Sequence, residues 1–400
     1  MKHPISILSI PALAGGASHL IPLFVLEKRY FNKMSDINNA FLVAEEKHNT
    51  LKELNVNVAP IDYKLEIKSV NDDFSIHKEN LSKMESQAYN LVQPNIILED
   101  NSFNTPLIAE KNNIPRISIH RTGFFRSLPL EQRNSNHVHS LEKGMGDSKM
   151  SDASVFLDST IGNPLSEEHK NDTILLKNYL SSKTKLIPGI PSLEVLPENI
   201  EDRESYFYTG PLIMEDNPSD TLLDELKVFI QMNKNSKTVF ITTGLIDTTS
   251  IDVYVNHLLN MGYAIISTIN IIIDQNYQHQ FFYNRFLPLN YVCSIVDLVI
   301  HQCGSGMYHY PILNEKPTLT IGTQCYDRED VAIRLEQLGV SKHIPHPNDD
   351  PNYLEIFKTH LRSFENNQLC DFKKLGELKD EIYETMLNFD MQEVINYTLN

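Results

Sequence analysis

The sequence predicts an α/β protein made of two Rossmann-like, doubly wound domains, and three observations lead to this prediction. The chain has 400 residues, which is too long for one typical core and fits two domains of about 150–200 residues each. Short apolar runs alternate with helical stretches, which is typical of parallel sheets covered by helices. The alternation occurs twice, on either side of a break at Leu196–Ser205 that contains Pro197 and the charged run Glu198–Glu204.

The first series of elements, which we assign to residues 1–200, begins with the apolar run Ile5–Ile10. Turn residues flank this run, as expected for a strand that is buried on both faces. The stretch Leu20–Phe31 is predicted to be a helix because its apolar side chains recur on one side. By the same criteria, further strands are expected at Ala40–Val43, Val56–Ala59, Asn95–Leu98 and Arg116–Ile119, and further helices at Leu81–Val92 and Thr105–Asn112.

The second series, assigned to residues 201–371, starts with the aromatic run Tyr206–Tyr208 and a Gly-Pro turn. Apolar runs and helical stretches again alternate after this turn. Strands are expected at Thr238–Thr242, Tyr263–Ser267, Leu298–Ile300 and Thr318–Ile321, and helices at Ile251–Met261 and Met307–Leu313. The remaining residues, 372–400, contain two helical patterns, Phe372–Leu387 and Met391–Leu399.

Composition excludes several classes of function. A net charge of −17 argues against a nucleic-acid partner, which would need a basic face. The chain lacks an apolar run long enough to span a membrane. Lys2 and Ala12–Ala14 resemble parts of a secretory signal, but Pro4 and Pro11 interrupt the apolar stretch between them. The four cysteines are scattered without a C-x-x-C pair, which indicates reduced thiols in a cytoplasmic protein and neither a disulfide framework nor a zinc site: Cys293, Cys303, Cys325 and Cys370.

One segment of the second series carries most of the functional information. The apolar run Leu298–Ile300 ends at His301 and is followed by the turn Gly304-Ser305-Gly306, a helical stretch and the next apolar run. Strand, glycine turn, helix and strand form a βαβ unit, in which the start of the helix presents free backbone N–H groups. Such a turn can bind a diphosphate, although glycine turns also serve to let a helix and a strand pack closely.

The wider segment resembles the donor-sugar site of inverting glycosyltransferases with the GT-B fold, of the family-one and MurG-like kind. In that family a segment H-x-G-G-x-G-T-x-x-E-A leads to a G-V-P turn and a D-Q pair. His301, Gly304 and Gly306 fall on the histidine and glycine positions, Pro317 on the proline and Asp327 on the aspartate, without any insertion. The match continues at Ala332, Arg334 and Gly339. The resemblance implies two domains that face each other across a cleft, with C-terminal helices that return to the first domain.

Three positions of this segment depart from the family pattern. Met307 replaces the threonine, Tyr310 replaces the glutamate that usually binds the ribose hydroxyls, and Arg328 replaces the glutamine after Asp327. These changes affect the recognition of the donor more directly than the frame that holds it.

Two residues of the first series are candidates for acid/base chemistry. His19 follows the first strand, and Ser18-His19-Leu20-Ile21-Pro22 resembles the G-H-x-x-P segment whose histidine is the general base of these enzymes. An imidazole suits a base that works near neutral pH. Asp100 ends a later strand and would orient His19, although adjacent Glu99 is an alternative and Asp100 can instead cap a helix.

The resemblance assigns further contacts to the donor. Thr243 and Gly244 end a strand where the family has a small-residue turn at the donor phosphates, although a plain strand-to-helix turn explains them equally well. His301 would reach the β-phosphate as a neutral or a protonated donor. Asp327 would bind sugar hydroxyls, whereas Arg328 would pair with a charged group of the donor or point to solvent.

These assignments predict a metal-independent hexosyltransferase without a cofactor, monomeric or homodimeric, that inverts the sugar configuration. The donor would be a UDP- or dTDP-linked sugar, and the acceptor a hydroxyl of a small molecule or a lipid. Two alternatives stay open, namely a GT-B-fold sugar-nucleotide epimerase and a non-catalytic sugar-nucleotide binder. The polar stretch 123–159 is either an acceptor loop or an insertion.

Overall fold

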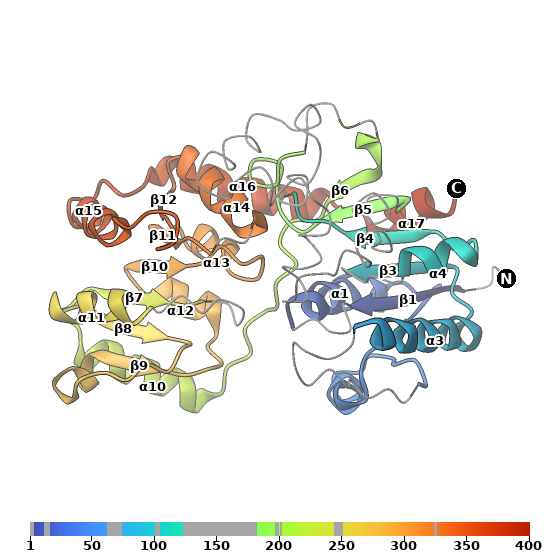
Figure 1. Ribbon diagram of the computed structural model, residues 1–400, viewed down its shortest axis with the longest axis horizontal. Coiled ribbons are helices and arrows are strands. Elements are labelled where there is room, and N and C mark those ends of the chain that lie inside the picture. Colours follow the sequence, from blue (N-terminus) through green and yellow to red (C-terminus); the bar gives the residue numbers. More distant parts are fainter. Residues whose placement is uncertain are drawn as a thin grey trace.

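The computed structural model describes residues 4–11, 17–61, 74–100, 105–122, 182–196, 200, 202–243, 251–323 and 326–400. These residues form two parallel β-sheets with helices on both faces, which lie side by side (Figure 1). Each sheet has six strands within the described part of the chain. The predicted fold class of two doubly wound α/β units is therefore confirmed.

The first sheet has the strand order β2-β1-β3-β4-β5-β6, and all of its neighbouring strands pair in parallel. Its strands are β1 (Ile5–Pro11), β2 (Ile37–Phe41), β3 (Ile96–Asp100), β4 (Arg116–Ile119), β5 (Thr184–Ile187) and β6 (Tyr206–Tyr208). Its helices are α1 (Ala17–Arg29), α2 (His48–Glu53), α3 (Phe74–Val92) and α4 (Thr105–Lys111).

The second sheet has the order β12-β11-β10-β7-β8-β9 and is also parallel throughout. Its strands are β7 (Thr238–Ile241), β8 (Ala264–Ser267), β9 (Phe281–Tyr283), β10 (Leu298–His301), β11 (Thr318–Ile321) and β12 (Ser341–Ile344). Its helices are α10 (Asp220–Met232), α11 (Asp252–Asn260), α12 (Leu289–Ile295), α13 (His309–Leu313), α14 (Tyr326–Gln337) and α15 (Tyr353–Glu365).

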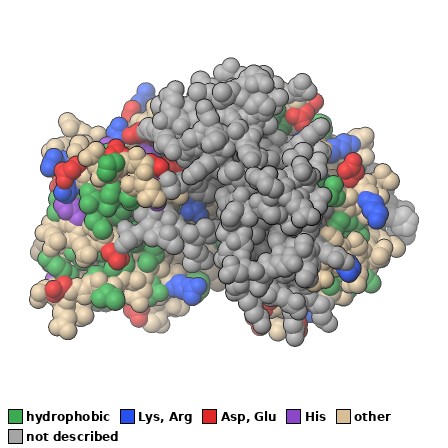
Figure 2. Space-filling model, in the orientation of Figure 1, with side chains coloured by type: hydrophobic (Ala, Val, Ile, Leu, Met, Phe, Trp, Pro, Cys, Tyr) green, Lys and Arg blue, Asp and Glu red, His purple; other side chains and the backbone are tan. Residues whose placement is uncertain are grey.

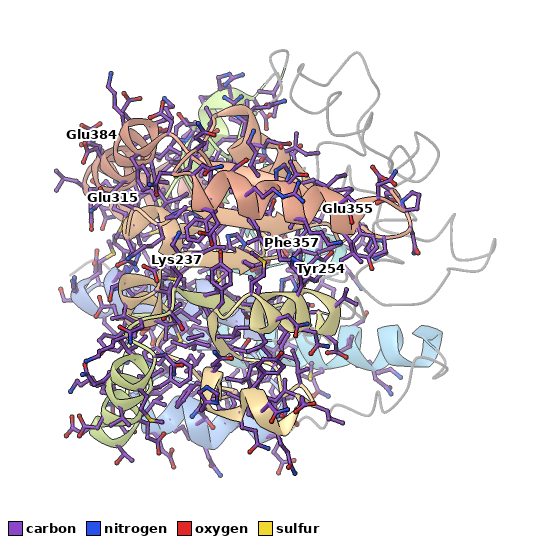
Figure 3. All side chains as sticks on the ribbon, turned by 90° about the vertical axis from the view of Figure 1, so that its left-hand side faces the viewer. Lys237, Tyr254, Glu315, Glu355, Phe357 and Glu384 are labelled. Carbon is purple, nitrogen blue, oxygen red and sulfur yellow. The ribbon has the colours of Figure 1, made fainter. Side chains whose placement is uncertain are left out.

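Each sheet is buried on both faces, because neighbouring residues of a strand point to opposite sides. In β1, Ile7 packs in one apolar core and Leu8 in another, and in β10 Leu298 and Val299 separate in the same way. On one face of the second sheet, the rings of Tyr254 and Phe357 join α11 to α15 in an edge-to-face contact, with centroids 5.0 Å apart (Figure 3). Full burial of such side chains stabilises the fold by about 1.5–3 kcal/mol each.

The structure corrects three expectations about the first sheet. The second strand is Ile37–Phe41 and not Ala40–Val43, and the predicted strand Val56–Ala59 contributes only an isolated bridge from Val58 to Phe41. The run Tyr206–Tyr208 does not start the second series, because it pairs with β5 as the edge strand of the first sheet. The chain therefore leaves the first sheet after β6, later than the charged run at residues 198–204 suggested.

The last helices, α16 (Phe372–Asn388) and α17 (Met391–Leu399), run from the second sheet back to the first (Figure 1). Near the second sheet, Lys379 of α16 forms an ion pair of 2.6 Å with Glu315, which follows α13. In α17, Thr398 shares a hydrogen bond of 2.7 Å with Thr184 of β5. The expected return of the C-terminal helices to the first domain is thus confirmed.

Acidic, basic and hydrophobic side chains are interspersed over the described surface that Figure 2 presents. Mixed surfaces of this kind favour solubility. None of the helices in the described part of the chain combines the length and the apolar composition that crossing a bilayer requires.

Candidate functional site

His19 lies at the start of α1, directly after the segment that follows β1. It was expected in a loop, but α1 begins at Ala17, so His19 belongs to the first turn of the helix. Pro22 follows within the helix, where its missing N–H removes one hydrogen bond of the first turns. The His19 side chain is partly accessible, with 17% of its surface exposed. The first turn of α1 therefore carries an imidazole that solvent can reach.

Asp100, the last residue of β3, lies beside His19. Its Oδ1 is 3.1 Å from Nδ1 of His19, and the carboxylate is fully buried. Burial by itself would raise the pKa of Asp100, but the positive charge of Arg121 and the contact with His19 lower this pKa to about 2. Asp100 is therefore ionised at neutral pH and accepts a hydrogen bond from His19 when Nδ1 carries the proton.

Within the described residues, the carboxylate that contacts His19 is that of Asp100 and not that of Glu99. Glu99, the neighbour of Asp100 in β3, forms a buried ion pair with Arg116. Adjacent strand residues point to opposite faces of a sheet, so one of the two carboxylates must face away from His19. Both oxygens of Asp100 are bound by Arg121, and residues 101–104, which precede α4, lie outside the described residues.

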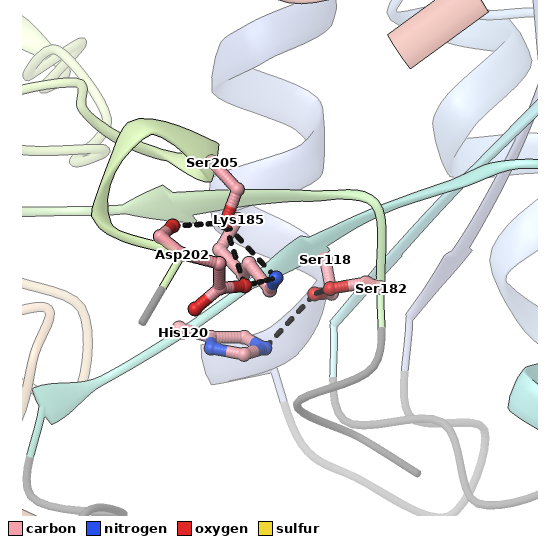
Figure 4. A network of polar contacts seen from close by, with 6 residues as sticks. All are labelled: Ser118, His120, Ser182, Lys185, Asp202 and Ser205. Carbon is pink, nitrogen blue, oxygen red and sulfur yellow. Dashed lines mark hydrogen bonds and ion pairs between the residues drawn. The ribbon is translucent and has the colours of Figure 1, made fainter. Parts of the chain in front are cut away.

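Three consecutive residues after β4 belong to three separate polar networks. His120 hydrogen-bonds to Oγ of Ser118 at 2.9 Å, Arg121 binds Asp100, and Thr122 binds Glu194. The network of His120 is shown in Figure 4, where it lies next to the buried ammonium group of Lys185. Lys185 donates to Asp202 and to Ser205, and these bonds hold β5 to the segment that leads into β6. Ser118 also shares a hydrogen bond with Ser182.

Glu194 connects the two halves of the molecule. Its Oε2 accepts hydrogen bonds from the N–H and the hydroxyl of Thr122, at 2.8 and 2.6 Å, and its Oε1 accepts one from Tyr308 at 2.9 Å. Tyr308 precedes α13, whereas Thr122 follows β4. Burial raises the pKa of Glu194, although these hydrogen bonds oppose the shift. Gly189 passes so close that a Cβ there would lie 2.6 Å from Cγ of Glu194.

His301 is the last residue of β10 and is fully buried. Its Nδ1 accepts a hydrogen bond of 2.9 Å from the N–H of Cys303, so the ring proton must reside on Nε2. Nε2 has no hydrogen-bond partner among the described residues. Burial lowers the pKa of His301 to about 3, which leaves the ring neutral. Of the two expected forms, the unliganded structure thus holds the neutral donor.

The turn after His301 leaves room above its glycines. Within the described part of the chain, a Cβ added to Gly304 or Gly306 would meet no atom within 4 Å, and neither glycine has a positive φ. Among these residues, neither close packing nor backbone conformation therefore requires glycine here. The N–H groups of residues 304–306 make no hydrogen bond to described residues, whereas the carbonyl of Gly304 accepts bonds from the N–H groups of Met307 and Tyr308.

The helix after this turn is shorter than predicted. It was expected from Met307, but α13 begins at His309 and has five residues, preceded by turns. Its dipole is therefore weaker than expected. The donors that this segment presents are therefore mainly the individual N–H groups of the turn.

The other residues expected to contact the donor follow the carboxyl ends of strands of the second sheet or begin the next helix. Thr243 follows β7, next to β10, and the N–H of Thr242 donates to the carbonyl of Ile300 at 3.0 Å. Gly244 lies outside the described residues. Asp327 is the second residue of α14, and its side chain also lies outside them. Arg328 is half-buried and does not point simply to solvent, because Nη1 lies 3.5 Å from Oε1 of Gln302, the neighbour of His301.

The side chain of Tyr310 contacts the segment that connects the two sheets. Its hydroxyl donates to the carbonyl of Met214, at 3.1 Å, in the segment that connects the two sheets. Arg29 of α1 holds the same segment at the carbonyls of Pro211 and Ile213. The hydroxyl, which is the only polar atom of the Tyr310 side chain, is therefore already bound within the protein.

His309, the neighbour of Tyr310, has the free polar atoms that Tyr310 lacks. The ring is fully buried, and neither nitrogen has a hydrogen-bond partner of good geometry among the described residues, although the carbonyl of Ser305 is near. Burial lowers the pKa of His309 to about 3. A neutral ring of this kind offers one donor and one acceptor. Asn314, one helical turn after Tyr310, is already bound to Asn290.

Known structures share this architecture over their whole length. The protein is similar to a glycosyltransferase of Medicago truncatula, UGT71G1, solved with UDP-glucose (14% identity, TM-score 0.71, 99% of this chain and 98% of that one covered). It is also similar to the glycosyltransferase of kitacinnamycin (15% identity, TM-score 0.67, all of both chains covered). The chain has the GT-B fold. No protein-family model and no curated protein sequence matches it.

Two residues that the sequence did not indicate are Arg121, which binds the partner of the candidate base, and Glu194, which joins the two halves of the GT-B chain. Arg121 had a usable signal, because three polar residues follow the predicted strand Arg116–Ile119 where a ligand crevice forms in such sheets. Glu194 had none, since it lies in a segment whose elements were not predicted. Its position depends on the close approach of Gly189 and Tyr308, which only the folded chain brings together.

Proposed function

We propose that this GT-B chain is an inverting glycosyltransferase that moves a sugar from a nucleoside-diphosphate sugar to a hydroxyl group. The observation that supports this most is the pairing of His19 with buried, ionised Asp100. A carboxylate that accepts the Nδ1 proton leaves Nε2 of the imidazole as a proton acceptor. The link from Thr122 through Glu194 to Tyr308, two residues after the glycine turn, supports a site that both sheets share.

The reaction would proceed as one displacement. The acceptor oxygen forms a bond with the anomeric carbon while its proton passes to Nε2 of His19. The bond from the anomeric carbon to the diphosphate breaks, and the diphosphate leaves with the electron pair. A single displacement inverts the configuration at that carbon.

The second sheet would stabilise the departing diphosphate. The N–H groups of residues 304–306 and Nε2–H of His301 are donors without partners in the described chain. Donors fixed in place stabilise charge that develops in a transition state. Arg328 adds a cation near the same turn. We propose that these groups neutralise the charge without a metal ion and that the enzyme needs no cofactor.

The class of substrate follows from the neighbours in fold. One of them is complexed with UDP-glucose, and another, UGT89C1 of Arabidopsis thaliana, is complexed with quercetin (13% identity, TM-score 0.65, all of both chains covered). We therefore propose a UDP- or dTDP-linked hexose as the donor and a hydroxyl-bearing small molecule as the acceptor. The free thiols of Cys293, Cys303 and Cys370 suit a reducing compartment such as the cytoplasm.

Incubation of the purified protein with a panel of sugar nucleotides tests the proposal. With extracts as a source of acceptors, mass spectrometry should find new hexose conjugates, and EDTA in excess should leave the rate unchanged. Without acceptor, slow hydrolysis of the donor fits a transferase. Interconversion of sugars would instead identify an epimerase, and binding without turnover would identify a non-catalytic binder. A complete loss of activity in EDTA that metal restores would contradict the metal-free model.

A further inference from the structure

The carboxylate of Asp100 is shared between an imidazole and a guanidinium. Arg121 donates from Nη1 to Oδ1 at 2.8 Å and from Nη2 to Oδ2 at 3.0 Å. Oδ1 also contacts Nδ1 of His19 at 3.1 Å. The cation and the imidazole bind the same oxygen, so they lie within two hydrogen-bond lengths of each other. All three groups are buried or nearly so.

The bidentate contact has two physical effects. It fixes the plane of the carboxylate, because a guanidinium fork matches both oxygens at once. It also places a permanent positive charge beside His19, which opposes the addition of a second positive charge to the imidazole. A lone buried Asp100 would have the opposite effect and would favour the imidazolium form.

Other titratable groups among the described residues lie near this triad. From β3, Glu99 is neutralised by Arg116. On the side of the second sheet, Tyr308 lies close enough to Arg121 for the cation to lower the pKa of its phenol, against a larger rise from burial. Glu194 is bound by Tyr308 and by the residue after Arg121.

We propose that Arg121 is a positioning residue for the base: its two hydrogen bonds hold the Asp100 carboxylate in plane against His19, and its charge opposes the addition of a positive charge to the His19 imidazole. The catalytic meaning of this role rests on the proposed function. The electrostatic effect does not, because it acts on His19 whether or not a substrate is turned over.

The test is a titration of the His19 ring by NMR in the full-length protein, with its signal assigned by loss in His19→Gln. Arg121→Gln removes the charge and retains an amide donor. We expect it to move the titration midpoint of His19 upward by about one to two pH units. Arg121→Lys retains the charge and should leave the midpoint close to that of the wild type. Arg116→Gln, which removes the partner of Glu99, is the matched control and should not move it either.

A second background keeps the proposal testable if Arg121→Gln does not fold. Asp100→Asn together with Arg121→Gln removes the buried pair as a unit, which folded proteins tolerate better than the loss of one partner. The His19 midpoint in this double variant should lie above that in Asp100→Asn alone. An unchanged or lower midpoint in the charge-removing variants would overturn the proposal.

The same variants separate this inference from the proposed function. If the wild type transfers sugar, the acidic limb of its kcat/KM profile should move to higher pH in Arg121→Gln, in step with the titration. If the wild type shows no transfer while the midpoint shifts as expected, the proposed function fails and the electrostatic role of Arg121 stands. If transfer occurs and the midpoint stays in place, only the role of Arg121 fails.

Discussion

The two halves of the candidate site differ in how their polar groups are satisfied. On the first sheet, His19, Asp100 and Arg121 are bound to one another, so the charges of that half are balanced inside the protein. On the second sheet, the rings of His301 and His309 are neutral, buried and left with nitrogens that have no partner in the described chain. An unpaired buried donor costs about 1–3 kcal/mol, which a bound anion or hydroxyl would recover. The groups of the first half are therefore already paired, and we propose that a ligand pairs those of the second half.

The largest effect should follow from the base, which belongs to the half whose groups are already paired. His19→Ala should lower kcat by about 10²–10⁴, because general base catalysis is lost. The Kd for the nucleotide should stay within a few-fold of the wild type, since the proposed donor contacts lie on the other sheet. Calorimetry and initial rates measure the two quantities. His279→Ala is the matched control, because it removes an exposed histidine that lies before β9 and outside the candidate site. Equal activity in both variants would remove His19 from the mechanism.

A second test turns to a buried carboxyl group beside the first sheet, outside the candidate site, and asks whether it makes stability depend on pH. Glu85 of α3 is buried and accepts a hydrogen bond from Tyr89, and burial raises its pKa to about 8. The unfolded chain loses this proton near pH 4.5, whereas the folded chain keeps it up to about pH 8, so stability falls as pH rises between these values. The slope is about 1.4 kcal/mol per pH unit.

Glu85→Gln should remove this contribution, so that the variant gains stability relative to the wild type from pH 5 to pH 8. Urea denaturation at several pH values measures the difference. Glu384→Gln, at an exposed position of α16, should track the wild type. If the gap between Glu85→Gln and the wild type is the same at every pH, Glu85 is not the group that titrates.

The third prediction concerns His301, in the half of the candidate site that lies on the second sheet. His301→Asn keeps an acceptor for the N–H of Cys303, because an asparagine side chain can bond to the backbone two residues on, but it deletes Nε2. The Kd for UDP should rise about tenfold to a hundredfold, as expected for one hydrogen bond to a charged group. His257→Asn, on α11 at the other face of the same sheet, should leave the Kd unchanged. An unaltered Kd in His301→Asn would mean that the free Nε2 does not meet the nucleotide.

The smallest expected effect is the discrimination between ribose and deoxyribose. No carboxylate stands at Tyr310, and its hydroxyl is occupied by Met214. A site that makes no strong bond to a hydroxyl loses little when that hydroxyl is absent. The Kd values for UDP and dTDP should therefore differ by about tenfold at most. A preference of a hundredfold or more for UDP would indicate a ribose ligand, and loss of that preference in His309→Leu would identify it.

Much of the fold followed from patterns that are local in the sequence. Apolar runs such as Ile5–Ile10 and Leu298–Ile300 became central strands because strands buried on both faces are predominantly apolar. Edge strands were missed or misassigned. Neither Ser341–Ile344 nor Phe281–Tyr283 was predicted, and Tyr206–Tyr208 was assigned to the wrong sheet. Edge strands are short and partly exposed, so their sequences differ less from loops.

By itself the sequence determined the class of fold, the two sheets, the glycine turn after His301 and the two residues, His19 and Asp100, that lie 3.1 Å apart. Each of these depends on periodicity or on a residue type required at one place. Only the tertiary structure decided that Arg121 shares Asp100, that Glu194 joins Thr122 to Tyr308, and that Tyr310 binds Met214 while His309 stays free. These contacts join residues from distant parts of the chain, and they form only when packing fixes the direction of each side chain.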